Sequence, residues 1–397
     1  MLEEASRLPS LGLSVNEKSS VPLEKKRVGT LCIIAIFAVL CATQWPFNPW
    51  PANKVAWLPG GNGLRFERAG VIVSDGALRL AHQAPAEDSC SIELLLRPTS
   101  VKVSGTILTF YVPNNPAHLL VRQWTDFLVV NHDSVDAAGK FRRTKLDVDH
   151  DLQTGRMLLL TITSGPKGTL VYWDAAHPQS FPKFTISTSE LLEQIVLGTS
   201  PVDFSPWLGE IHGLAVYSKE LTPAEVSRHY AEWTAGQPIK LGVEDAAIAR
   251  YSFSERAGRE IRNNVAGGPN LLIPVNFNVP HKPMLRSAIK EFDPNRLYFK
   301  DAMLNIAGFV PLGIILCVYF SFTYPRFQAI LLATLVGALL SLVIEVLQAY
   351  IPSRDSGTTD IITNTIGALI GAALANPNLA RKILLRFQEP PTPKPAS

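Results

Sequence analysis

Cysteine is scarce in this sequence, with four residues in 397, and their positions exclude a disulfide framework and a zinc site. Three of them, Cys32, Cys41 and Cys317, lie in apolar runs, while Cys90 stands alone in the middle of the chain. A lone cysteine has no internal partner there, and no two cysteines have the spacing of metal ligands. Small cross-linked domains are therefore excluded.

An excess of charge of either sign is also missing. Lys and Arg number 37 against 34 Asp and Glu, which leaves a formal net charge of +3. A nucleic-acid-binding chain would carry a basic stripe, so no nucleic-acid partner is expected. The sequence is instead rich in apolar residues, with a mean hydropathy of +0.14. Such an average indicates that part of the chain is solvated by lipid.

The first apolar stretch, residues 28–45, is uncharged and just long enough to cross a bilayer. The basic residues Lys25, Lys26 and Arg27 precede it and Trp45 closes it. Basic residues favour the cytoplasmic side, so residues 1–27 are expected to form a cytoplasmic tail. A cleaved signal peptide is the alternative, but this stretch is long for one and no clear cleavage site follows it.

Three further apolar runs lie near the C-terminus, at about 302–321, 328–350 and 359–375. Three such runs in succession, joined by short loops, predict a helical membrane bundle over 301–376, with four spans in total when the first stretch is included. Counting sides through these spans places the Pro-rich tail, 377–397, in the cytoplasm, and basic residues at its start agree with that placement. The protein is thus expected to be a multi-pass protein of the cell (inner) membrane with both termini cytoplasmic.

The region between the first span and the bundle has the character of an extracytoplasmic β domain. From 53 to 240, short strands of alternating apolar residues are separated by turns such as Ser-Asp-Gly and Pro-Asn-Asn-Pro. Many short strands at this spacing predict an all-β sandwich or jelly roll. Residues 241–300 form a connecting segment that either adds a strand to this sandwich or begins a partial second repeat, and both alternatives stay open.

The end of this region resembles the closing segment of laminin-G and concanavalin A-like domains. In that segment a Trp-x-Gly turn leads into a strand that ends in Tyr-Ser, followed by a short helix. The matching residues are Trp207, Gly209, Ile211, Ala215, Tyr217, Leu221 and Val226. The local sequence also predicts the start of the helix, because Thr222 can cap it, Pro223 suits its first position and Glu225 can complete a capping box.

Related sandwiches often bind sugars, and some bind calcium. Candidate platforms for sugar stacking are Trp124, Trp173 and Trp207, although each of them also suits the core. The candidate calcium ligands are Asp147, Asp149 and Asp151, which would share one face of a strand. A solvated strand end explains the same pattern, and the glycine that an EF-hand loop needs is missing. No other cofactor is evident.

The three C-terminal spans carry polar residues at helical spacing. Asp301 and Asn305 lie on one face of the first, and Asp360 and Asn364 on one face of the last. The middle span has the stripe Ser341, Glu345 and Gln348, and Arg354 follows in the next loop. On the expected topology, these groups meet near the outer leaflet.

Glu345 is the most informative of them, because an ionised Glu facing lipid would cost about 2–3 kcal/mol or more. It is therefore expected to face the bundle, where Arg354 is the nearest cation in the sequence. A polar pocket and simple hydrogen bonding between helices both explain this arrangement.

The same residues resemble the VanZ family. The family pattern has an Asn before Phe-x-Pro-x-Gly, then Ser-x-x-x-Glu-x-x-Gln, and then Arg, Asp and Asn-x-x-Gly. The matching residues are Asn305, Phe309, Pro311, Gly313, Ser341, Glu345, Gln348, Arg354, Asp360, Asn364 and Gly367. The resemblance implies a bacterial envelope protein with a link to glycopeptide (teicoplanin) resistance. It also implies that residues 28–45 correspond to the family's first helix, with the β domain inserted after it.

Together these features predict an envelope protein that is more a binder than an enzyme. Its outer domain would bind a cell-wall glycan or surface polysaccharide, and its bundle would present a polar site at the outer leaflet, for example to a lipid-linked intermediate. A membrane enzyme acting on a lipid head group is one alternative, although the polar residues include no His. A surface adhesin anchored by the bundle is the other.

Overall fold

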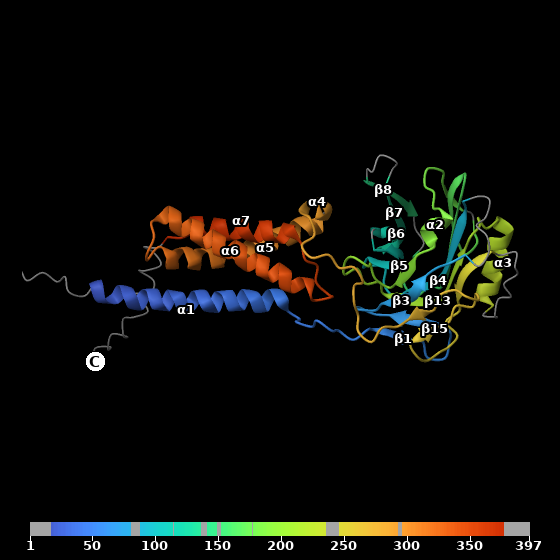
Figure 1. Ribbon diagram of the computed structural model, residues 1–397, viewed down its shortest axis with the longest axis horizontal. Coiled ribbons are helices and arrows are strands. Elements are labelled where there is room, and N and C mark those ends of the chain that lie inside the picture. The colour runs from blue at the N-terminus through green and yellow to red at the C-terminus, as the bar shows by residue number, and fades with distance from the viewer. Residues whose placement is uncertain are drawn as a thin grey trace, which may run out of the picture. The chain divides into compact units, whose positions relative to one another are not determined.

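The computed structural model describes residues 17–80, 88–113, 115–135, 141–148, 152–176, 178–235, 246–292 and 296–376. The chain divides into two compact units. The helical unit comprises Met1–Phe47, Met284–Tyr350 and Ser356–Ser397, and the sandwich unit comprises Asn48–Pro283 and Ile351–Asp355. Each unit is considered by itself (Figure 1).

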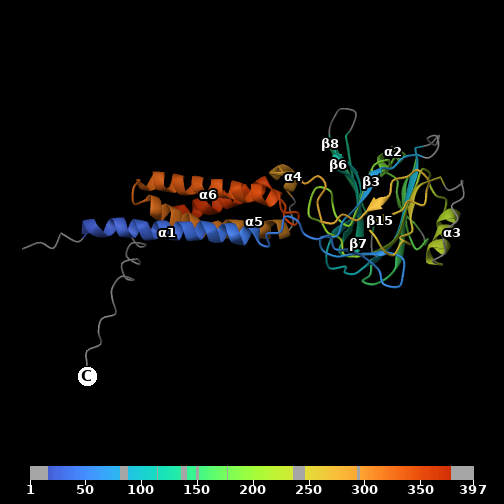
Figure 2. The same ribbon diagram turned by 60° about the horizontal axis from the view of Figure 1, so that its bottom comes forward.

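The sandwich unit consists of two antiparallel sheets, which confirms the predicted β-sandwich (Figure 2). Sheet I runs in the order β1 (Val55–Trp57), β2 (Leu64–Phe66), β13 (Gly209–Tyr217), β4 (Cys90–Pro98), β9 (Leu158–Gly165), β10 (Gly168–Trp173) and β11 (Gln179–Phe181), with β14 (Ala247–Tyr251) also paired to β13. Sheet II runs in the order β15 (Glu260–Ile261), β16 (Leu271–Leu272), β3 (Ile72–Ala77), β12 (Gln194–Leu197), β5 (Gly105–Val112), β6 (Asn115–Trp124), β7 (Phe127–Val135) and β8 (Phe141–Val148). A short helix, α2 (Thr188–Leu191), precedes β12.

The main hydrophobic core lies between the two sheets. Alternate residues of each strand face it, as the period of two predicts. In β9, for example, Leu158, Leu160 and Ile162 belong to this core and are at most 1% exposed. Leu159, on the opposite face of β9, is equally buried in a second cluster. Sheet I is therefore covered on both faces at β9, which explains why this strand reads as a nearly continuous apolar run.

The second cover of sheet I is the helix α3 (Pro223–Thr234). The helix begins as predicted, with a capping box between Thr222 and Glu225 and a proline at its start. Val226 and Trp233 of the helix pack against the outward face of sheet I. The segment that resembles the end of a laminin-G domain thus forms the last central strand and the helix that covers it.

The residues that follow α3 join the same sandwich. Strand β14 pairs with β13, and the β15–β16 hairpin pairs with β3, so residues 247–272 extend both sheets. This segment therefore supplies strands to the first sandwich and does not form a separate partial repeat within the described residues. The outgoing chain then lies beside the incoming one, since Asn53 N donates to Val275 O at 3.1 Å and Phe277 N donates to Pro51 O at 2.8 Å.

The helical unit contains α1 (Glu17–Gln44), the short α4 (Ala288–Glu291), α5 (Arg296–Phe320), α6 (Arg326–Ala349) and α7 (Thr358–Leu374). Three segments are long and apolar enough to cross a membrane, Leu23–Gln44, Tyr298–Phe320 and Arg326–Ala349, and α7 is a shorter apolar helix. The protein is therefore a multi-pass membrane protein, and the predicted fold class is confirmed.

Small residues let α5, α6 and α7 pack closely. A side chain at Gly313 of α5 would collide with the backbone of Ala368 in α7, and one at Gly371 of α7 would collide with the backbone of Val310 in α5. Gly337 of α6 likewise faces Ala368. Such close approach of backbones is typical of helix packing in lipid, where van der Waals contact rather than the hydrophobic effect holds helices together.

Candidate functional site

The polar stripe of α6 faces the interior of the helical unit. Glu345 is 1% exposed and its Oε2 accepts a hydrogen bond from the backbone N–H of Gly357 at 2.7 Å. Gly357 is the N-cap residue of α7, so the carboxylate lies at the N-terminus of that helix. The helix dipole favours a negative charge at this position. The hydroxyl of Ser356 also donates to the backbone oxygen of Glu345, at 2.8 Å.

Two further pairs of predicted site residues connect α7 to its neighbouring helices. Asn364 Nδ2 donates to Ser341 Oγ at 2.9 Å, which joins α7 to α6. Asn305 Nδ2 donates to Asp360 Oδ1 at 2.8 Å, which joins α5 to α7. The helical spacing read from the sequence therefore does bring polar groups of three helices together, and they form specific hydrogen bonds.

The other predicted residues lie apart from these pairs. Gln348 Nε2 donates to the backbone oxygen of Thr43 at 3.0 Å, so it contacts α1. Asp301 is exposed near the start of α5. Arg354 belongs to the sandwich unit, where its N–H donates to Ile351 O at 3.0 Å. Its expected pairing with Glu345 stays a prediction.

Arg286 is a residue that the sequence reasoning missed. Its backbone lies beside the N-terminus of α7, because its N–H donates to Ser356 O at 2.9 Å and its oxygen accepts from Thr358 N at 2.8 Å. It therefore contacts the same short segment that holds the Glu345 carboxylate. No pattern around Arg286 could reveal this, since it comes about 60 residues before Glu345 and lies outside every apolar run.

The three tryptophans named for sugar stacking have different surroundings. Trp207 is 1% exposed and its Nε1 donates to Gln123 Oε1 at 2.7 Å, while Trp173 is 7% exposed within the same core. Both indoles are covered on their faces by core residues. Trp124, at the end of β6, is 42% exposed and so offers a ring to solvent.

The candidate calcium site falls largely outside the described residues, which do not include Asp149 and Asp151. Asp147 lies on β8 with an exposed side chain, and its Oδ2 is 3.2 Å from Lys145 Nζ. Within the described ranges, no group of three or more His, Cys, Asp and Glu side chains has a geometry suited to a metal ion.

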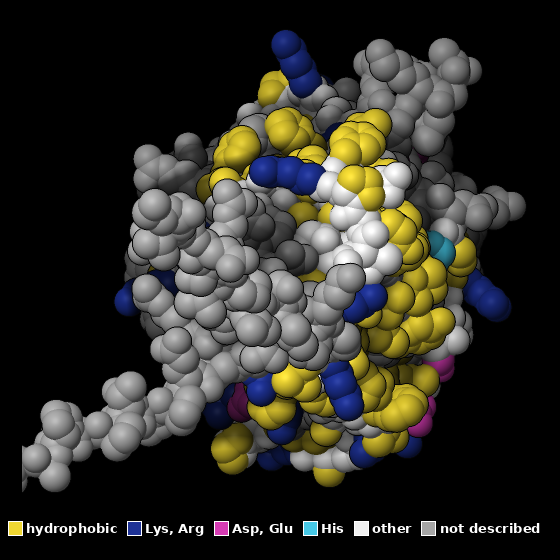
Figure 3. Space-filling model, turned by 90° about the vertical axis from the view of Figure 1, so that its left-hand side faces the viewer, with side chains coloured by type: hydrophobic (Ala, Val, Ile, Leu, Met, Phe, Trp, Pro, Cys, Tyr) yellow, Lys and Arg dark blue, Asp and Glu magenta, His cyan; other side chains and the backbone are white. Residues whose placement is uncertain are grey.

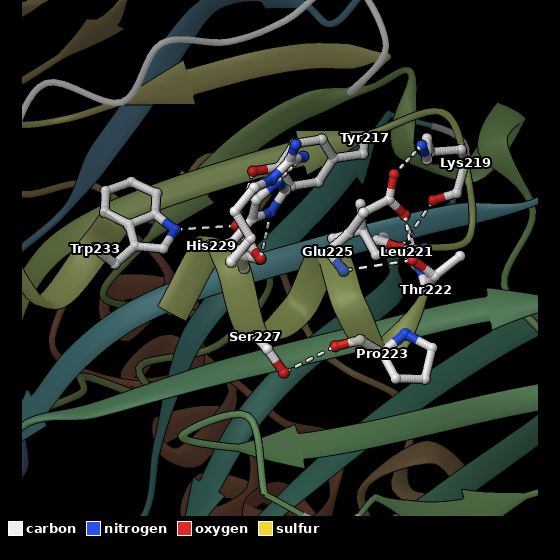
Figure 4. A network of polar contacts seen from close by, with 12 residues as sticks. Tyr217, Lys219, Leu221, Thr222, Pro223, Glu225, Ser227, His229 and Trp233 are labelled. Atoms are coloured by element: carbon white, nitrogen blue, oxygen red, sulfur yellow. Dashed lines mark hydrogen bonds and ion pairs between the residues drawn. The ribbon is translucent and has the colours of Figure 1, made fainter. Parts of the chain in front are cut away.

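A second buried carboxylate, that of Glu93, lies under α3 and was not predicted; Tyr217, His229 and Trp233 around it are labelled in Figure 4. Glu93 of β4 is fully buried and accepts hydrogen bonds from Tyr217 Oη at 2.7 Å and Trp233 Nε1 at 2.9 Å. His229 Nδ1 lies 3.0 Å from its other oxygen. Buried carboxylates require such donors, and here they come from the helix and the strand that it covers. This network therefore fixes α3 on sheet I.

Comparison with known families agrees with the resemblance found for the C-terminal spans. Residues 247–381 match the model of the family described as VanZ/LLP1. The match includes α5, α6 and α7 and also β14–β16 of the sandwich. It does not include α1, so the correspondence of residues 28–45 to the family's first helix stays a prediction. No curated protein matches the chain.

The sandwich is similar to binding domains among solved structures. The receptor binding domain of botulinum neurotoxin type G has 16% identity and a TM-score of 0.31, with 46% of this chain and 45% of that chain covered. The binding domain of botulinum neurotoxin serotype D/C has 13% identity and a TM-score of 0.36, with 48% of each chain covered. A Bacteroides ovatus protein with a suggested role in carbohydrate binding has 12% identity and a TM-score of 0.36, with 55% of this chain and 61% of that chain covered.

This chain spans about half the length of the neurotoxin domains. It is a multi-pass membrane protein with a VanZ/LLP1 region at its C-terminus and a β-sandwich domain.

Proposed function

We propose that this protein acts in the bacterial envelope, where its sandwich binds a glycan or surface polymer and its bundle presents a polar site around Glu345. The observation that carries the proposal is the buried carboxylate of Glu345 at the N-terminus of α7. Ionisable residues inside membrane bundles are costly, and they commonly mark a path or binding site. A lipid-linked cell-wall intermediate, with a sugar head group and a long apolar chain, has both parts that such a protein would contact.

The basic residues of the bundle support the proposed orientation of this site. Lys25 Nζ of α1 donates to Thr323 Oγ1 in the α5–α6 turn at 2.8 Å, and Arg326 Nη2 donates to Ala373 O near the end of α7 at 3.3 Å. Figure 3 faces this end, where Lys and Arg side chains stand among hydrophobic ones. Basic residues favour the cytoplasm, so the opposite end, where α7 begins beside Glu345, is assigned to the outer leaflet.

For the sandwich, Trp124 is the residue proposed to contact the polymer. An exposed indole can stack on a sugar ring, and the other two candidates are buried. The metal prediction contributes nothing to this proposal, because two of its three ligands lie outside the described residues.

The experiment that tests the bundle site is the substitution Glu345→Gln, read out as teicoplanin resistance of cells that express the protein. The amide oxygen of Gln can still accept the hydrogen bond from Gly357, so the packing should persist while the charge is lost. We expect resistance to fall to that of cells without the protein, at unchanged abundance in the membrane.

The matched control is Thr334→Ala, earlier on the same helix. It removes a hydroxyl that donates to Ile330 O within α6 at 2.9 Å, and no charge. We expect this variant to retain both abundance and resistance. Full resistance in a normally inserted Glu345→Gln protein would contradict the proposal and leave helix–helix adhesion as the role of the stripe.

A further inference from the structure

A cluster of charged residues lies on the outward face of sheet I, on strands β2, β4 and β13. Glu210 of β13 pairs in register with Arg65 of β2 on one side and with Arg97 of β4 on the other. Directly opposed residues of antiparallel strands point to the same face, so the two guanidinium groups flank one carboxylate. We call these three residues with His212 the Arg65–Arg97 cluster.

The carboxylate of the cluster is covered and its cations are accessible. Glu210 Oε1 accepts from Arg65 Nη2 at 2.9 Å and from Nε at 3.2 Å, and Glu210 Oε2 accepts from Arg97 Nη1 at 3.3 Å. The side chain of Glu210 is 6% exposed, against 48% for Arg65 and 40% for Arg97. The buried anion therefore orients two partly exposed cations.

The donors of the cluster outnumber its acceptors. A guanidinium carries five N–H donors, and only part of those of Arg65 and Arg97 are used on Glu210. The Nε of Arg97 is buried and has no hydrogen-bond partner among the described residues. A buried donor without a partner is costly, and the packing of β4 must offset that cost.

The charge balance of the cluster also favours an anion. Burial would by itself raise the pKa of Glu210, but hydrogen bonds from Arg65 and His212 and the charge of Arg97 hold it below its usual value. Burial lowers the pKa of His212, while hydrogen bonds to Asn62 and Glu210 oppose that shift. Two guanidinium charges face one carboxylate charge, so the cluster has a net positive charge in either protonation state of His212.

A third cation lies beside the cluster. The backbone oxygen of Asn62 is 2.8 Å from His212 Nδ1, and the side-chain oxygen of the same residue accepts from Arg256 Nε at 3.0 Å. Asn62 therefore connects the loop that carries Arg256 to the edge of the cluster.

We propose that the Arg65–Arg97 cluster binds an oxyanion, namely the phosphate or carboxylate group of an acidic surface polymer. Guanidinium groups match both groups with paired N–H···O bonds, and here a buried carboxylate holds them in place before the ligand arrives. This inference rests on the proposed function, since it names the class of polymer that the sandwich binds. The alternative is that the two ion pairs only join the three strands.

The test is binding to the full chain in nanodiscs of phosphatidylcholine, which carries no net charge. The probes are inorganic polyphosphate, polygalacturonate and neutral dextran, and the measurement is the dissociation constant at low and high salt. We expect at least one polyanion to bind, with an affinity that falls as salt rises, and dextran to bind more weakly at this site. The stronger of the two polyanions identifies the group.

The variants Arg65→Gln and Arg97→Gln are expected to weaken polyanion binding about tenfold or more, because each removes charged hydrogen bonds. The matched control is Arg156→Gln, since Arg156 is an Arg of similar exposure that is paired with Asp174 at 3.0 Å elsewhere in the sandwich. This control should bind within about twofold of the parent chain, as expected for a surface ion pair. Unchanged binding in both cluster variants would overturn the proposal.

A second variant covers the case in which the loss of an arginine unfolds the sandwich. Glu210→Gln removes one negative charge from the cluster and keeps a side-chain oxygen that can still accept from a guanidinium group, so polyanion binding should become tighter. If the cluster only joins strands, the same variant should lower thermal stability without tightening binding, and that result would count against an anion site.

Loss of the oxyanion site and loss of glycan binding give different results in separate measurements. Trp124→Ala is measured in the same nanodiscs against soluble peptidoglycan fragments, and weaker binding there supports a glycan-binding sandwich whatever the polyanions do. Polyanion binding that both cluster variants abolish supports the oxyanion site even if Glu345→Gln retains full resistance.

Discussion

Glu225 shows how a single residue can control one end of a helix. Its carboxylate accepts from Thr222 N at 2.8 Å and from Lys219 Nζ at 2.6 Å. Burial alone would raise the pKa of Glu225, but the hydrogen bonds from Lys219 and Thr222 lower it to about 2. The charged form is therefore stabilised in the folded protein, at the N-terminus of α3 where the helix dipole also favours it.

This shift predicts how the stability of α3 depends on pH. A carboxylate whose pKa is lower in the folded state than its ordinary 4.5 stabilises the fold above pH 4.5, and that contribution is lost as the pH falls from 4.5 to about 2. Glu225→Gln should lower stability at neutral pH by about 1 kcal/mol, as expected for a weakened cap, and flatten the acid dependence in this window.

The measurement for Glu225→Gln is the melting temperature of the full chain, followed by tryptophan fluorescence from pH 7 to pH 2. Glu67→Gln, at an exposed position on the same sandwich, is the control and should follow the parent curve. A parallel acid dependence in the parent and in Glu225→Gln would show that the capping carboxylate contributes nothing at low pH.

At this scale, the sequence predicts interactions between near neighbours only. The capping box joins Thr222 to Glu225, three positions apart, and it is present as predicted. Glu210 and Arg65 lie 145 positions apart, so only the order of strands in sheet I brings them together. The sequence did not distinguish the exposed Trp124 from the buried Trp207, because both residues have polar neighbours in the sequence.

At the scale of elements, the buried Glu93 couples α3 to sheet I. In the parent chain, Tyr217, His229 and Trp233 contact the two carboxylate oxygens of Glu93. Glu93→Gln leaves a single side-chain oxygen, so at least one of these three residues should lose its partner. A buried donor without a partner costs about 1–3 kcal/mol. We expect faster hydrogen exchange in α3 and a lower melting temperature of the sandwich.

Ser227→Ala is the matched control, because this exposed hydroxyl of α3 donates only to Pro223 O within its own helix, at 2.9 Å (Figure 4). Its exchange rates should resemble those of the parent chain. If Glu93→Gln gave the same exchange as Ser227→Ala, the network would not be what holds the helix on the sheet.

The same scale shows what helical periodicity can and cannot predict for the bundle. Spacing placed Ser341 and Glu345 on one face of α6, and both are buried as that face requires. Which groups they meet depends on how far α7 is shifted along α6, and glycines such as Gly337 determine that shift through close packing. The Ser341–Asn364 and Glu345–Gly357 contacts therefore had to be seen in the structure.

At the scale of the whole molecule, the proposed topology is open to a direct test. With Cys41 replaced by Ser, Ser254→Cys in the sandwich and Tyr324→Cys in the α5–α6 turn give two exposed thiols, while the other native cysteines are buried. A membrane-impermeant maleimide should label Ser254→Cys on intact cells and Tyr324→Cys only after permeabilisation, because basic residues keep the turn inside. The reverse pattern would place Glu345 near the inner leaflet and refute the proposed site.

The side-by-side arrangement of residues 51–53 and 275–277 has a consequence for the history of the protein. Because the sandwich begins and ends at adjacent backbone segments, its coding sequence could be acquired or deleted in a single recombination event. The flanking membrane helices would then need to change only the few residues at the junction. Relatives that consist of the bundle alone, and others that carry an unrelated domain at the same junction, are therefore the expected products of such exchange.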